Sequence, residues 1–103
     1  MSIKKQFLKS KPVCKVTFRV DASETSGAKA VQLLGDFNHW DKSAEPMTAL
    51  KSNDFTATLE LETGKTYQFR YLIDGAVWKN EAQADSFVAN GLGEENSVVS
   101  TVQ

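Results

Sequence analysis

Residues 67–75 decide the fold, and they read Tyr67-Gln68-Phe69-Arg70-Tyr71-Leu72-Ile73-Asp74-Gly75. Side chains two positions apart lie on the same face of a β-strand. The alternation therefore predicts a strand with one face in a core and the other, which carries Gln68, Arg70 and Leu72, in water. Asp-Gly after the strand favours a two-residue turn with positive φ, so Ala76–Lys79 is expected to return as the second strand of a hairpin.

Two further stretches show the same alternation. Every second residue is apolar in residues 14–20 and again in residues 55–61, which predicts two more strands with one buried face each. Shorter apolar runs predict strands at Ala30–Leu34 and Ser97–Val102. The inward-facing residues of the two long strands are Cys14, Val16, Phe18, Val20, Phe55, Ala57, Leu59 and Leu61.

Turn-forming residues separate these strands. Glu62–Lys65 lies between two alternating runs and predicts a hairpin turn, and the polar stretch Asp21–Lys29 predicts a loop. Six to eight short strands in 103 residues predict an all-β fold, an immunoglobulin-like antiparallel β-sandwich. We expect residues 13–103 to form this domain and residues 1–12 to form a solvated, lysine-bearing N-terminal arm.

The composition argues against several classes of protein. Twelve Lys and Arg residues against 13 Asp and Glu residues give a formal net charge of −1, without the basic bias of nucleic-acid-binding proteins. No apolar run approaches the roughly 20 residues that span a membrane, and residues 1–10 lack the apolar segment of a secretory signal. With Cys14 as the single cysteine, no internal disulfide is predicted, and we expect a cytoplasmic monomer.

The residues capable of catalysis or metal binding are scattered. His39 is the only histidine and lies among turn residues, while Cys14 lies on an apolar strand face, which is typical of a buried structural thiol. No His, Cys or carboxylate cluster has ligand spacing, and no carboxylate pair is marked out for glycoside hydrolysis. We expect no enzymatic activity, no cofactor and no metal site.

The two tryptophans are the residues that core packing explains least. Trp40 ends a turn-rich stretch, and Trp78 follows the Asp-Gly turn. Each either folds back as a lid on the core or is exposed for binding. An exposed indole can cover the C–H face of a pyranose ring while polar side chains bond its hydroxyls. Arg70 and Asn96 are candidates for that polar role, because both are expected outside the core.

Three segments together resemble one known family. They are Leu34-Gly35-Asp36-Phe37-Asn38-His39-Trp40, the stretch 67–75 followed by Trp78, and Leu92-Gly93 with Asn96-Ser97-Val98-Val99. The segments resemble the carbohydrate-binding module of the β-subunit of AMP-activated protein kinase, which binds glycogen. They are also similar to early-set domains at the N-termini of isoamylases, pullulanases and glycogen branching enzymes. The resemblance covers about residues 15–102 and implies an immunoglobulin-like sandwich that binds α-1,4-linked glucan: glycogen, starch or maltooligosaccharide.

The resemblance also implies which residues contact the glucan. Trp40 and Trp78 match two tryptophans that stack on glucose rings. Arg70 matches a basic residue, and Asn96 an asparagine, that hydrogen-bond the sugar. Leu92 matches a leucine that inserts against the glucan. The same comparison assigns no catalytic residue.

Two departures from the family pattern leave a second interpretation open. Glu94, which we include in the predicted site, stands where glycogen-binding members often carry threonine. Trp78 follows one extra residue after Asp-Gly, and a one-residue insertion in a strand can turn its side chains to the other face. The alternative is a sugar-independent interaction or regulatory module that docks on a glucan-metabolising enzyme or another protein partner.

Overall fold

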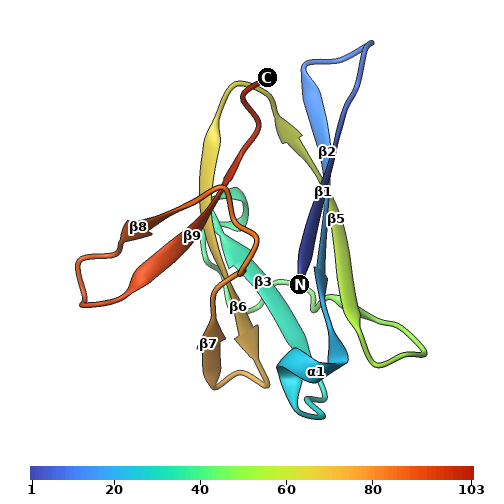
Figure 1. Cartoon of the computed structure of the whole chain (residues 1–103), viewed down its shortest axis with the longest axis vertical. Coiled ribbons are helices and arrows are strands. Elements are labelled where there is room, and N and C mark those ends of the chain that lie inside the picture. Colours follow the sequence, from blue (N-terminus) through green and yellow to red (C-terminus); the bar gives the residue numbers. More distant parts are fainter.

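The chain folds as a sandwich of two facing antiparallel β-sheets (Figure 1). The computed structural model describes all 103 residues. The four-stranded sheet has the order β1-β2-β5-β4, and the five-stranded sheet has the order β3-β6-β9-β8 with β7 paired to β6. The all-β sandwich is thus confirmed, with nine strands instead of six to eight. They are β1 (Ser2–Phe7), β2 (Val13–Val20), β3 (Val31–Gly35), β4 (Thr48–Ala49), β5 (Phe55–Glu62), β6 (Thr66–Ile73), β7 (Val77–Lys79), β8 (Ser86–Ala89) and β9 (Glu95–Ser100).

The core lies between the two sheets, where the predicted alternation places it. Phe18 of β2 meets Phe69 of β6 edge-on, with ring centroids 5.1 Å apart. Phe37 is half-buried and packs against Phe18, with the two ring centroids 6.0 Å apart. Burying one such side chain stabilises the fold by about 1.5–3 kcal/mol. Core residues without exposed surface are Cys14, Val16, Phe18, Val20, Val31, Phe69, Tyr71 and Val99.

Residues 2–7 form a strand that the sequence pattern did not reveal. β1 pairs with β2 along its whole length, from Ser2 opposite Arg19 to Phe7 opposite Cys14. Ile3 and Phe7 pack against the core. Residues 1–12 therefore contain an edge strand of the four-stranded sheet, while the division of the chain at residue 12 stays a prediction.

The predicted hairpin at Glu62–Lys65 is wrong. β5 and β6 flank this turn, but they belong to different sheets, so the turn carries the chain across the sandwich (Figure 1). Its backbone bonds to other segments: Gly64 N–H donates to the carbonyl of Thr101 at 3.0 Å. The Thr101 hydroxyl in turn donates to the carbonyl of Glu62 at 2.6 Å. Both strands still bury one face, because they face the same core from opposite sides.

The two remaining elements are short helices. Helix α1 (Ala22–Thr25) lies within the predicted loop 21–29, and the 3-10 turn η1 (Asp36–Asn38) follows β3. Neither has the length or the apolar character needed to cross a membrane.

Candidate functional site

The outer face of the five-stranded sheet carries the candidate site. Because Phe69 and Tyr71 of β6 point into the core, Arg70 and Leu72 point outward. β3 places Leu34 opposite Arg70, and β7 places Trp78 opposite Leu72. We expected Leu72 in water, but Leu72 and Leu34 are both buried and lie outside the main core cluster. The outer face is therefore covered by side chains that form a second apolar layer.

Trp40 reaches this face because the chain turns sharply after β3. A Cβ on Gly35 would lie 2.5 Å from the carbonyl oxygen of Gln68, so only glycine fits where η1 begins. His39 and Trp40 then both adopt the left-handed conformation, with φ of 58° and 55°. This conformation is strained for residues other than glycine, and it persists where surrounding contacts fix the backbone. Here the N–H of Trp40 donates to the carbonyl of Gly35 at 3.0 Å.

Asp36 fixes the orientation of the Trp40 indole. Its Oδ1 accepts a hydrogen bond from Nε1 of Trp40 at 3.1 Å. Its Oδ2 accepts one from the backbone N–H of Gln68 at 2.8 Å. One carboxylate thus ties the turn after β3 to the neighbouring strand β6. Asp36 is not among the predicted site residues, although its place in a turn, four residues before Trp40, was the available signal.

Trp78 lies on the same face despite the extra residue before it. Ile73 pairs with Val77, so three residues, 74–76, form the loop in place of the predicted two. Asp74 and Gly75 have the predicted positive φ, 50° and 68°. The insertion is absorbed in the loop and does not change the face to which Trp78 points.

The two tryptophans converge from segments 38 positions apart in the sequence. Their ring centroids lie 6.2 Å apart, and the ring planes meet at 58°. Both residues are half-buried, so each indole is neither a fully buried lid on the core nor a fully exposed ring. Arg70 joins them, with the carbon of its guanidinium 4.9 Å from the centroid of the Trp78 ring. The arrangement presents two inclined aromatic surfaces beside a cation.

The Arg70 side chain is largely enclosed, and its polar contact within the chain is an ion pair with Glu94. Its side chain is 11 % exposed, and Nη1 lies 3.6 Å from Oε2 of Glu94. Its Nε is buried and has no hydrogen-bond partner. Buried donors are normally paired, so the unpaired Nε is an exception, and a ligand oxygen could reach it only if the side chains that cover it move.

The remaining predicted residues flank Arg70 on the β8–β9 side. Leu92, 83 % exposed, lies in the loop between these strands. Oδ1 of Asn90 accepts the N–H groups of Leu92 and Glu94, at 2.9 and 3.3 Å, and shapes the loop. The side chain of Asn96 lies on the outer face, where its Nδ2 donates to Oε1 of Gln68 at 3.1 Å. Trp40 thus contacts Trp78, Trp78 contacts Arg70, and Arg70 contacts Glu94. Asn96 and Leu92 lie beside this row, on the neighbouring strand and loop.

Lys42 and Gln32 also belong to this face, although neither is among the predicted site residues. The Nζ of Lys42 lies 5.7 Å from the centroid of the Trp78 ring. Nε2 of Gln32 donates to the carbonyls of Lys42 and Ala44, at 2.7 and 2.9 Å, and holds that loop against the sheet. No motif in the sequence marks these contacts, because they depend on how the loop folds back.

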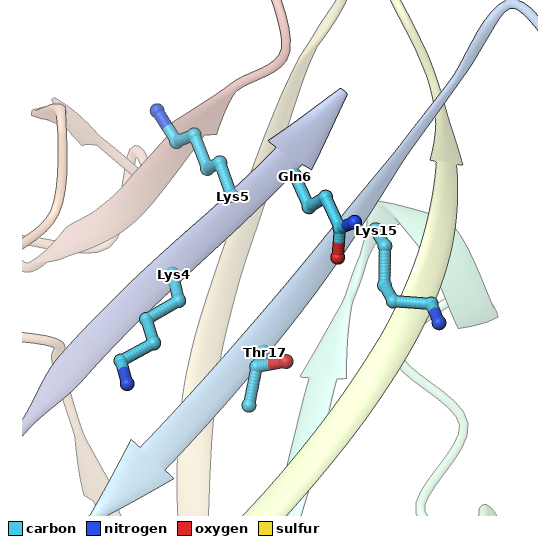
Figure 2. Close-up of a pocket in the computed structure, with 5 residues that line it drawn as sticks. All are labelled: Lys4, Lys5, Gln6, Lys15 and Thr17. Carbon is cyan, nitrogen blue, oxygen red and sulfur yellow. The ribbon is translucent and has the colours of Figure 1, made fainter. Parts of the chain in front are cut away.

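Other parts of the surface offer less. A shallow hollow along β1 and β2 is lined by Lys4, Lys5, Gln6, Lys15 and Thr17 (Figure 2). Figure 2 shows these side chains spread over the strands without converging on one point. Lys5 forms an ion pair with Asp85, with Nζ 2.7 Å from Oδ2. No three His, Cys, Asp or Glu side chains lie together in an arrangement that could hold a metal ion.

Comparison with known proteins assigns the chain to a family. A search of curated proteins finds no match. A family model described as the glycogen recognition site of AMP-activated protein kinase matches residues 19–103. The match spans most of the sandwich, from the end of β2 through β9, and includes all six predicted site residues. The chain therefore belongs to the family of the glycogen recognition site of AMP-activated protein kinase, a family of carbohydrate-binding modules.

Proposed function

We propose that this protein binds α-1,4-linked glucan, such as glycogen or maltooligosaccharide, on the outer face of its five-stranded sheet and performs no chemistry on it. The observation that carries the proposal is the convergence of Trp40 and Trp78, 6.2 Å apart, beside Arg70, in a chain of a glycogen-recognition family. The family supports the ligand class, and the geometry supports the place.

The two indoles would stack on the apolar faces of glucose rings. Their 58° inclination suits a chain of sugars that curves, because consecutive rings of an α-1,4-linked glucan do not lie in one plane. Aromatic rings supply such contact area at little cost in side-chain entropy. Trp40 is the better fixed of the two, since Asp36 holds its N–H.

Polar groups around the indoles would bond the sugar hydroxyls. Arg70 offers the terminal N–H donors of its guanidinium, and Asn96 offers an amide whose contact with Gln68 can be exchanged for one with sugar. Leu92 would add an apolar contact from the β8–β9 loop. The contact area of such an open face is small, so we expect dissociation constants on the order of micromolar to millimolar.

Binding without catalysis is consistent with the use of the carboxylates at this face. Glycoside hydrolysis requires two carboxyl groups that flank the scissile bond and exchange protons with it. Here Asp36 accepts hydrogen bonds from Trp40 and Gln68, and Glu94 pairs with Arg70. Each carboxylate supports a neighbouring side chain.

An NMR titration with maltoheptaose tests the proposal. The indole N–H signals of Trp40 and Trp78 should shift in a saturable manner, together with the amides of Arg70 and Asn96. Trp40→Ala should abolish these shifts while the spectrum stays dispersed. Phe87→Ala is the matched control, because Phe87 is an exposed aromatic residue (43 %) whose strand position points to the opposite face. Unchanged binding in Trp40→Ala would reject the site.

One observation favours a second candidate function. The Glu94 carboxylate already engages Arg70, 3.6 Å away, at a position where family members often carry threonine. A protein that had exchanged sugar binding for protein docking would show such a change. Glu94→Thr separates the two: in a glucan-binding module it frees Arg70 and strengthens binding, whereas in a docking module neither form binds maltoheptaose.

A further inference from the structure

Trp78 carries two cations over its ring, and they are held very differently. The Arg70 guanidinium lies 4.9 Å from the ring centroid and the Lys42 ammonium 5.7 Å from it. Arg70 is 11 % exposed and pairs with Glu94. Lys42 is exposed, and no carboxylate lies within ion-pair distance of it. The indole is the one partner that the Lys42 ammonium has.

The backbone beneath Lys42 is fixed even though its side chain is not. Gln32 binds the carbonyls of Lys42 and Ala44, at 2.7 and 2.9 Å. The Asp41 carboxylate accepts both the hydroxyl and the backbone N–H of Ser43, at 2.7 and 2.9 Å. These bonds keep the pKa of Asp41 below its usual value. A change at Lys42 therefore alters a side chain over Trp78 and leaves the loop in place.

A glucose ring that stacks on Trp78 needs indole surface that a cation covers in the free chain. We propose that Lys42 covers Trp78 in the absence of ligand and leaves the ring when glucan binds, so that it sets the affinity by competition. Of the two cations Lys42 is the one able to leave, because Arg70 is enclosed and paired with Glu94. This inference rests on the proposed function and adds a residue that limits the strength of binding.

Removal of the competitor should strengthen binding. Lys42→Ala should lower the dissociation constant for maltoheptaose about two- to fivefold, which is the equivalent of an exposed cation–π contact. Lys51→Ala is the matched control, since Lys51 is an exposed lysine in the turn between β4 and β5, away from the indoles. It should leave the dissociation constant unchanged.

A second measurement follows Lys42 in the unaltered protein. Protons over an indole ring resonate upfield, so the side-chain methylene signals of Lys42 should be shifted upfield in the free protein. Titration with maltoheptaose should return them to ordinary lysine values along the same curve as the indole N–H shifts. Dissociation constants for the three proteins come from the same titrations.

The outcomes separate this inference from the proposed function. Tighter binding by Lys42→Ala together with the return of the methylene signals supports it. Equal or weaker binding by Lys42→Ala, or methylene signals that stay upfield at saturation, overturns it while glucan binding stands. A flat titration of the unaltered protein rejects the proposed function and the competition with it.

Discussion

The carboxylate of Asp36 accepts the indole N–H of Trp40 at 3.1 Å, and its second oxygen accepts the backbone N–H of Gln68 at 2.8 Å. We predict that Asp36→Ala weakens maltoheptaose binding several-fold, because the indole loses the group that orients it. Stability should fall by about 1–2 kcal/mol from the lost hydrogen bonds. Isothermal titration and urea denaturation measure the two effects.

Asp41→Asn is the control for this change. Asp41 also lies beside Trp40 in the sequence, but its carboxylate bonds Ser43 and not the indole. It should change maltoheptaose binding far less than Asp36→Ala does. Equal losses in both variants would show that Asp36 acts through charge alone.

Leu92 tests whether the β8–β9 loop takes part in binding. Because its side chain is 83 % exposed, Leu92→Ala should change the free energy of unfolding by less than about 0.5 kcal/mol. Maltoheptaose binding should nevertheless weaken, since an apolar contact with the sugar is lost. Val102→Ala, another exposed apolar residue (60 %), serves as the control and should alter neither quantity. Intact binding in Leu92→Ala removes this loop from the site.

Gly35 is required by the close approach of β3 to β6. A methyl group there would lie 2.5 Å from the Gln68 carbonyl oxygen and 2.9 Å from the Phe37 ring. We expect Gly35→Ala to cost about 1–3 kcal/mol and to shift the Phe37 and Trp40 signals together. Gly64→Ala, where the added methyl meets open space at a φ of 75°, should leave those two residues undisturbed. Thermal denaturation and NMR spectra check both variants.

Tyr71 should give the stability an alkaline pH dependence. Burial, the charge of Glu81 and a 2.8 Å hydrogen bond to that carboxylate raise the pKa of Tyr71 far above its ordinary value of 10.0. The resulting stabilisation is complete below pH 10 and is lost as the pH rises further, because the unfolded phenol ionises there while the folded one does not. Denaturation at pH 7, 9 and 11 should show this decline.

Tyr71→Phe separates the hydrogen bond from the titration. It should cost about 1–3 kcal/mol at pH 7, since the buried Glu81 loses a donor, and it should flatten the decline above pH 10. Tyr67→Phe, whose hydroxyl is exposed and bonds the Glu62 carbonyl, should have the smaller effect. A decline that is as steep in Tyr71→Phe would assign it to other groups.

Asp54 should act at the acid end. Hydrogen bonds from Arg19 and from the backbone N–H of Ala22 hold its pKa below the usual 3.8. A lowered pKa stabilises the fold above pH 3.8, and that stabilisation is lost as the pH falls below it. Asp54→Asn should therefore be less stable than the unaltered protein at pH 7, with a smaller difference at pH 2. Glu45→Gln, at an exposed residue outside the ion pairs, should match the unaltered protein at pH 7 in urea denaturation.

Alternation in the sequence identified the strands but not their partners. The pattern of β6 places Phe69 and Tyr71 in the core correctly, because one face of a strand is buried in any sandwich. The same pattern is compatible with a hairpin or a crossover, so it could not show that Glu62–Lys65 joins two sheets. β1 was missed because Lys5 interrupts its apolar face, at an edge where the lysine reaches Asp85.

The site was predictable in its residues and not in its supports. Trp40, Trp78 and Arg70 followed from the family resemblance, and the structure brings them together. The roles of Asp36 and Lys42 depend on how the turn after β3 and the loop beyond it pack against the sheet. The local sequence does not reveal that packing, because polar residues such as aspartate are common in turns whatever they contact.

β6 is the shared neighbour of β3, which leads to Trp40, and of β7, which carries Trp78. The two indoles meet only when both pairings with β6 exist, so no short peptide that lacks one of these strands can present them together. Ligand binding at this face and folding of the chain are therefore thermodynamically linked. Any ligand that binds this face stabilises the folded chain, so the melting temperature should rise with the ligand concentration.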